Sequence, residues 1–162
     1  MLVINADKTG TLTFPFDPRL GEVLWTHDGR KMAIVSHDSD APGDFSEIAI
    51  TDIETGSIFT LNEGSKSAWS LDGTRVSFAS QYSVGKGFSL SVMDPDGTYL
   101  LEFNDGFNAR CGGVWSADGR RMAFFSSDRD GNHNLYVKDA DGANLKQLID
   151  GYYSYNCPVW SP

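Results

Sequence analysis

The chain has 162 residues, which is room for one ordinary domain. Its 13 Lys and Arg against 22 Asp and Glu give a net charge of −9, which disfavours binding to nucleic-acid phosphates or to anionic lipid. Hydrophobic residues make up 40% and aromatic residues 12% of the chain, so the composition is that of a globular rather than a disordered protein. The 17 glycines indicate many tight turns, and the two cysteines are too few for a disulfide scaffold.

A tryptophan motif repeats along the chain. The tryptophans recur at intervals of 44, 46 and 45 residues, a period typical of propeller blades and other repeat arrays. The first three each begin a Trp-(Ser or Thr)-x-Asp-Gly sequence, and the fourth stands in Trp-Ser-Pro. The motif residues are Trp25, Asp28, Gly29, Trp69, Asp72, Gly73, Trp115, Asp118, Gly119 and Trp160.

Each repeat predicts four short antiparallel strands. In the first repeat one strand ends at Trp25, and after the glycine turn a four-residue apolar run over 32–35 predicts a buried strand. An alternating strand over 48–52 and a fourth strand over 58–61 follow, separated by a second turn at 54–56. Asp-Gly suits the hairpin turns, because Gly adopts the positive φ that they need. The same pattern recurs in the next two repeats, no helical period is found, and the predicted fold class is all-β.

The repeat divides the chain unevenly. Residues 1–15 match the last two strands of a blade, complete blades are expected at 16–61, 62–103 and 104–149, and 150–162 match the first strand of a further blade. A propeller ring usually has at least four blades. We therefore expect a piece of a longer propeller, or a chain whose open edges are closed by another copy. A stable open monomer is the third alternative, but it would leave strand edges exposed.

The repeat strongly resembles that of TolB-like β-propellers. Its fullest form, over 115–142, is Trp-Ser-x-Asp-Gly-Arg-Arg-Met-Ala-Phe-Phe-Ser-Ser-Asp-Arg-Asp-Gly-Asn-x-x-Leu-Tyr-Val-x-Asp-x-Asp-Gly, and the resemblance covers essentially the whole chain. It implies an incomplete propeller ring of four-stranded antiparallel blades, with each Trp wedged between neighbouring blades and the Asp carboxylates accepting backbone N–H bonds in the turns. His27 stands where the family usually has Pro. Related repeats occur in periplasmic TolB, in prolyl-oligopeptidase-type and tricorn-type peptidases and in some polysaccharide lyases, so no single activity is implied.

Candidate binding residues lie in the more variable loops, which a blade places on one face of the disc. Tyr and Arg are favoured at binding hot spots, although these aromatic side chains could instead pack beneath their own loops. The predicted ligand- or partner-binding residues are His37, Asp38, Asp40, Tyr82, Arg110, Arg129, His133, Tyr152, Tyr153 and Tyr155.

The sequence offers little support for catalysis or for a cofactor. Residues 128–132 place oxygen side chains as a calcium loop does, but His133 and Asp139 then depart from the EF-hand pattern. We expect a plain hairpin there, with no metal site and no cofactor. Gly-x-Ser-x-Gly is absent, so no catalytic residue is assigned and the chain is not predicted to be an enzyme. Cys111 and Cys157 are offset by one position relative to Trp, which favours two reduced thiols over a disulfide.

The sequence therefore predicts a non-catalytic binding or assembly module that acts through protein–protein interaction, with a protein partner or a second copy of itself. The main alternative is a propeller fragment of a larger enzyme, a prolyl-oligopeptidase-like peptidase or a polysaccharide lyase, that binds or gates substrate. We expect no membrane insertion, because no apolar run reaches about 18 residues. The start of the chain lacks the features of a signal peptide, which suggests the cytoplasm, or the periplasm if the chain is a piece of an exported protein.

Overall fold

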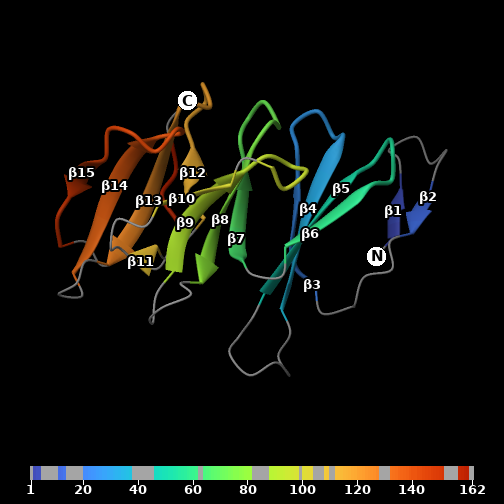
Figure 1. The fold of residues 1–162 in the computed structure, drawn as a ribbon, viewed down its shortest axis with the longest axis horizontal. Helices are drawn as coiled ribbons and strands as arrows, with labels where there is room; N and C mark the ends of the chain where they lie inside the picture. The colour runs from blue at the N-terminus through green and yellow to red at the C-terminus, as the bar shows by residue number, and fades with distance from the viewer. Residues whose placement is uncertain are drawn as a thin grey trace.

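The computed structural model describes residues 2–4, 11–13, 20–37, 46–61, 64–81, 88–98, 100–103, 108–109, 112–127, 132–151 and 157–160. Within these ranges every regular element is a β-strand, and none of them is a helix that could cross a membrane. The strands build three twisted antiparallel sheets that stand side by side along the molecule (Figure 1). The predicted all-β fold class is confirmed.

Each of the three sheets is one propeller blade, and its strands follow one another in sequence order. The first blade contains β3 (Leu20–Trp25), β4 (Lys31–His37), β5 (Ser46–Asp52) and β6 (Ile58–Leu61). The second blade contains β7 (Ser65–Trp69), β8 (Val76–Gln81), β9 (Phe88–Met93) and β10 (Leu101–Phe103). The third blade contains β13 (Arg121–Ser127), β14 (His133–Asp139) and β15 (Lys146–Ile149), with β11 (Asn108–Ala109) and β12 (Val114–Trp115) both pairing with β13 in the innermost position.

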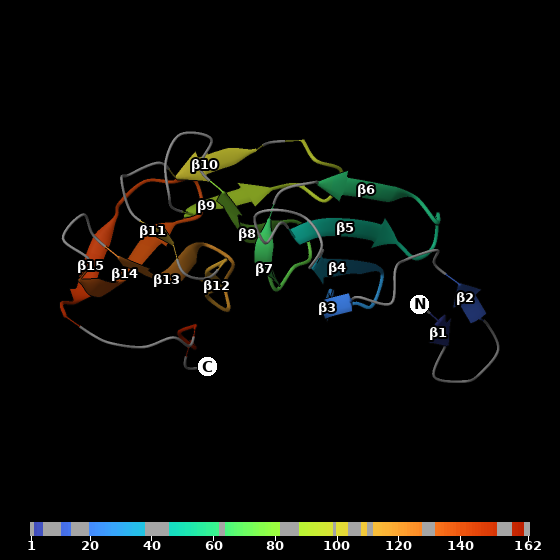
Figure 2. The same cartoon turned by 90° about the horizontal axis from the view of Figure 1, so that it is seen from below.

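A separate two-stranded hairpin precedes the blades. It joins β1 (Leu2–Ile4) to β2 (Thr11–Thr13) in antiparallel register, and within the described residues neither strand pairs with a third. The hairpin lies beyond the first blade, on the side away from the second (Figure 2). It therefore lies at the outer flank of the first blade.

The core consists of two apolar layers, each enclosed between neighbouring blades. In the first blade, β4 is buried on both faces, which explains its uninterrupted apolar run. Ala33 and Val35 face the second blade together with their strand partners Ile50 and Ile48, and all four belong to one buried cluster. The second blade contributes Val76, Phe78 and Met93 to that cluster.

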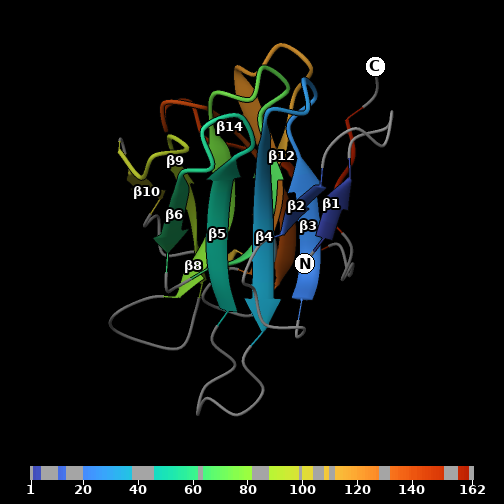
Figure 3. The same cartoon turned by 90° about the vertical axis from the view of Figure 1, so that its right-hand side faces the viewer.

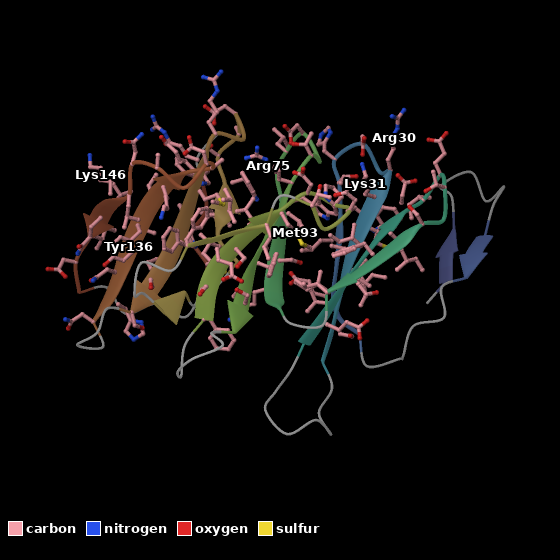
Figure 4. All side chains as sticks on the ribbon, in the orientation of Figure 1. Arg30, Lys31, Arg75, Met93, Tyr136 and Lys146 are labelled. Atoms are coloured by element: carbon pink, nitrogen blue, oxygen red, sulfur yellow. The ribbon has the colours of Figure 1, made fainter. Side chains whose placement is uncertain are left out.

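The other layer lies between the second and third blades. It joins Leu90, Val92 and Phe103 of the second blade to Trp115, Met122, Phe124, Tyr136 and Ala140 of the third. Met93 lies inside the array, whereas Arg30 extends from the hairpin end of the first blade (Figure 4). Met32 and Ile34, on the face of β4 that points away from the second blade, are also buried, at 0% and 1% exposed, although no described blade precedes the first one.

Candidate protein-binding interface

The tryptophans connect each blade to the one before it. In three of the four, the indole N–H donates to a backbone carbonyl on the preceding innermost strand, and the acceptor is the residue just before the preceding Trp. The three bonds join Trp69 to Leu24 (3.1 Å), Trp115 to Ala68 (3.2 Å) and Trp160 to Val114 (2.8 Å). The predicted position between neighbouring blades is confirmed for Trp69 and Trp115.

A hydrogen-bonded hairpin follows each of the first three tryptophans. In the second blade the Ser70 hydroxyl donates to Asp72 Oδ1 at 2.6 Å, and the backbone N–H of Thr74 donates to the same oxygen. The N–H of Arg75 donates to Ser70 Oγ, and Gly73 closes the turn with φ of +68°. The Ser70 hydroxyl, as the leading cause, lowers the pKa of the Asp72 carboxyl. Thr26 with Asp28 and Ser116 with Asp118 repeat the arrangement, which confirms that the turn carboxylates accept backbone bonds.

The hairpin carboxylates also line a groove. A cavity of about 820 Å³ opens between the first and second blades at their hairpin ends, lined by Asp28, Lys31, Asp72 and Arg75 among others. Asp28 and Asp72 each accept a backbone N–H bond within their own turn, so these two carboxylates of the groove wall stabilise the hairpins. Within the part of the chain that the structure describes, no group of three or more His, Cys, Asp or Glu could hold a metal ion.

Trp25 differs from the other tryptophans. Its side chain is 42% exposed, compared with 9% for Trp115, and among the described residues its indole N–H meets no acceptor. No described blade precedes the first one to supply such a carbonyl. The first blade thus presents an unused inter-blade donor, and Figure 3 views the molecule from this end.

The opposite end of the array is also partly open. Leu135 pairs with Ile149 in the third blade as Leu90 pairs with Phe103 in the second, so Ile149 and Phe103 are equivalent. Phe103 is 8% exposed beneath the third blade, whereas Ile149 is 42% exposed. Val159, which precedes Trp160 as Val114 precedes Trp115, is 91% exposed. The apolar position that Phe103 fills in the second blade is therefore covered there, whereas its equivalent Ile149 is accessible in the third blade.

Most of the binding residues predicted from the variable loops lie outside the residues that the structure describes. His37 ends β4, and His133 begins β14 with its Nδ1 3.3 Å from Ser127 Oγ, so the two histidines belong to different blades. Cys157 is exposed. Outside the described residues lie Asp38, Asp40, Tyr82, Arg110, Cys111, Arg129, Tyr152, Tyr153 and Tyr155.

The indole-to-carbonyl bonds were not predicted from the sequence. Their signal was present in the constant Trp period, because an acceptor one residue before each Trp must recur with the same spacing. The period alone does not say which atom the indole meets.

Comparison with known proteins supports the architecture. No family model matches the chain. An uncharacterized peptidase of Bacillus subtilis (strain 168), YuxL, is 43% identical over 49 residues, which are 30% of this chain and 7% of YuxL. The β-propeller domain of the Trilobed protease from Pyrococcus furiosus is similar with a TM-score of 0.62 and 13% identity over 80% of this chain and 42% of that one.

A second solved structure is that of a putative TolB from Agrobacterium tumefaciens, with a TM-score of 0.61 and 21% identity over 78% of this chain and 47% of that one. The chain thus spans less than half the length of each of these three proteins. The two structures share its antiparallel blades at low sequence identity, which is evidence about fold alone. The chain is a partial β-propeller, similar in fold to TolB and to the propeller domain of a protease.

Proposed function

We propose that this chain is a non-catalytic β-propeller module that binds protein through the open ends of its blade array. The exposure of Trp25 carries the proposal, because the equivalent side chains Trp69, Trp115 and Trp160 each bond to a neighbouring blade. Large apolar side chains that are exposed together mark interaction surfaces, and Trp is among the residues most enriched at binding hot spots.

Self-association is the form of this protein binding that is simplest to measure. Sedimentation velocity of the full chain across a wide concentration range should show species heavier than 17.8 kDa, increasing with concentration. Ile149→Asp, at the open face of the third blade, should reduce association, because it places a charge where a protein face would bury apolar surface.

Leu71→Asp is the matched control. Leu71 is 54% exposed but lies in the β7–β8 hairpin of the second blade, away from both ends of the array. This variant should associate like the unchanged chain. A single species of 17.8 kDa at every concentration would contradict binding between copies through the open ends.

The likeness to YuxL supports a second candidate function. A 49-residue stretch that is 43% identical to a peptidase is consistent with blades that belong to the propeller of a larger peptidase, where they would bind or gate substrate. The test is to read the gene on both sides of the segment that encodes these residues. A hydrolase domain with Gly-x-Ser-x-Gly in the same reading frame would support this candidate, and a frame without any further domain would rule it out.

A further inference from the structure

We propose that two copies of the chain associate head to tail, with Trp25 of one copy donating its indole N–H to the Val159 carbonyl of the other. The inference rests on the proposed function and names a second copy as the partner. It would add a fourth member to the series of bonds made by Trp69, Trp115 and Trp160.

The two ends of the array have complementary hydrogen-bonding groups. The acceptors Leu24, Ala68 and Val114 each immediately precede a Trp, and Val159 holds the same position before Trp160. Among the described residues no indole reaches the Val159 carbonyl, and no carbonyl reaches the Trp25 indole. One chain therefore carries a donor at its first blade and the matching acceptor after its third.

The direction of the bonds excludes pairing of like ends. Two first blades placed face to face would bring together two indole donors and no equivalent acceptor. A head-to-tail contact satisfies both groups, and it makes the interface heterologous. Within one chain, Trp160 bonds to Val114 of the third blade, and the second blade separates the third blade from the first (Figure 1), so we place the acceptor for Trp25 in another copy.

The surroundings of the two groups fit the same contact. Ile58 is 46% exposed on the first blade, and Val159 and Ile149 are exposed beyond the third. The β1–β2 hairpin flanks the first blade on the side away from the second, where the contact would form (Figure 2). If both copies make the contact at both ends, two chains close into one ring with no unused inter-blade donor.

The equivalent contact inside the chain indicates where a cross-link should form. Gly112 and Lys66 both lie three residues before a Trp, and a Cβ on Gly112 would overlap the Lys66 carbonyl oxygen. Cys157 and Glu22 occupy the same position relative to Trp160 and Trp25. Cys157 carries the Cβ that Gly112 lacks, so it cannot approach as closely as Gly112 does, but head-to-tail association would still bring Cys157 of one copy to the neighbourhood of Glu22 of the other, where a disulfide can test the contact.

The experiment is mild oxidation of Glu22→Cys at a concentration where sedimentation shows association, followed by non-reducing electrophoresis. We expect a covalent dimer from Glu22→Cys, none from Glu22→Cys with Cys157→Ser, and none from Leu71→Cys. In the unoxidised protein, Trp25→Phe keeps an aromatic ring but removes the donor, and should weaken association about tenfold for each head-to-tail interface.

The possible results separate the inference from the function on which it rests. Association that persists without a bridge between Glu22→Cys and Cys157, and that Trp25→Phe leaves unchanged, would overturn the head-to-tail contact but leave protein binding in place. A bridge formed within one chain would also overturn it. A chain that stays at 17.8 kDa at every concentration would overturn both the contact and the binding between copies.

Discussion

Replacing Trp115 with Phe tests whether the tryptophans hold the blades together. The change removes the N–H that donates to the Ala68 carbonyl at 3.2 Å and leaves a smaller ring in the layer between the second and third blades. We expect Trp115→Phe to lower the free energy of unfolding by about 2 kcal/mol, the combined effect of one hydrogen bond and of reduced apolar burial.

The hydrogen-bond part should not include the extra cost of leaving a buried carbonyl without a donor. The Ala68 carbonyl also accepts from the Ser77 hydroxyl at 3.3 Å, so it keeps a donor after the indole is removed. A net hydrogen bond contributes about 1 kcal/mol, and an apolar area of roughly 40 Å² adds about 1 kcal/mol. Trp115→Ala removes the ring as well and should cost about 3–5 kcal/mol.

The assay is urea unfolding followed by far-ultraviolet circular dichroism, because Trp fluorescence would change with the substitution itself. Trp25→Phe is the matched control, measured at a concentration where the chain is monomeric. Its indole meets no acceptor among the described residues and is 42% exposed, so the cost should stay below about 0.5 kcal/mol. Equal costs for the two variants would refute the assignment of Trp115 as an inter-blade contact.

Two further predictions concern backbone packing and acid. Gly112→Ala should lower the free energy of unfolding by at least about 1–3 kcal/mol, because its Cβ would overlap the Lys66 carbonyl. The control Gly29→Ala, at a φ of +69° with no neighbour within 4 Å, should cost about 1 kcal/mol in urea unfolding. Equal costs for the two variants would contradict the close approach of Gly112 to Lys66. Hydrogen bonds to the Asp118 carboxylate, of which that from the Ser116 hydroxyl has the largest effect, lower the pKa of Asp118 in the folded state below its ordinary value of 3.8. Their stabilising effect is therefore fully present at pH values above this ordinary pKa and is lost as the pH falls through the lower pKa of the folded state. Ser116→Ala should therefore reduce the acid-induced decrease in stability, measured as urea midpoints at neutral and low pH, and an unchanged decrease would refute the link.

The repeat made much of the fold predictable from the sequence. The Trp period located the contacts between blades, and the Asp-Gly pairs located hairpins whose carboxylates accept backbone bonds. Both features are short-range patterns that recur with the same residues. The alternation in β14 correctly put Leu135 and Val137 on one face, but that face is the partly exposed one, and Tyr136 on the other face is buried because the third blade packs there against the second.

The candidate interface was harder to predict. Trp25 carries the same motif as Trp69, and only the presence or absence of a neighbouring blade makes one indole donate to a carbonyl and leaves the other exposed. The exposure of Ile149 likewise depends on what covers the third blade, and its own sequence context resembles that of a covered strand. The loop residues chosen from composition depend on loop conformation, which a repeat pattern does not encode.

Because Trp69, Trp115 and Trp160 each bond to the repeat before their own, every such repeat carries the groups needed to join it to its neighbour. In the described residues each strand of the three blades pairs within its own blade, and Trp69, Trp115 and Trp160 each bond only to the blade before. Duplication of one repeat in the gene would therefore add a blade together with its own donor and acceptor, without requiring compensating changes elsewhere. The number of blades can thus change during evolution while the chemistry of each junction stays the same.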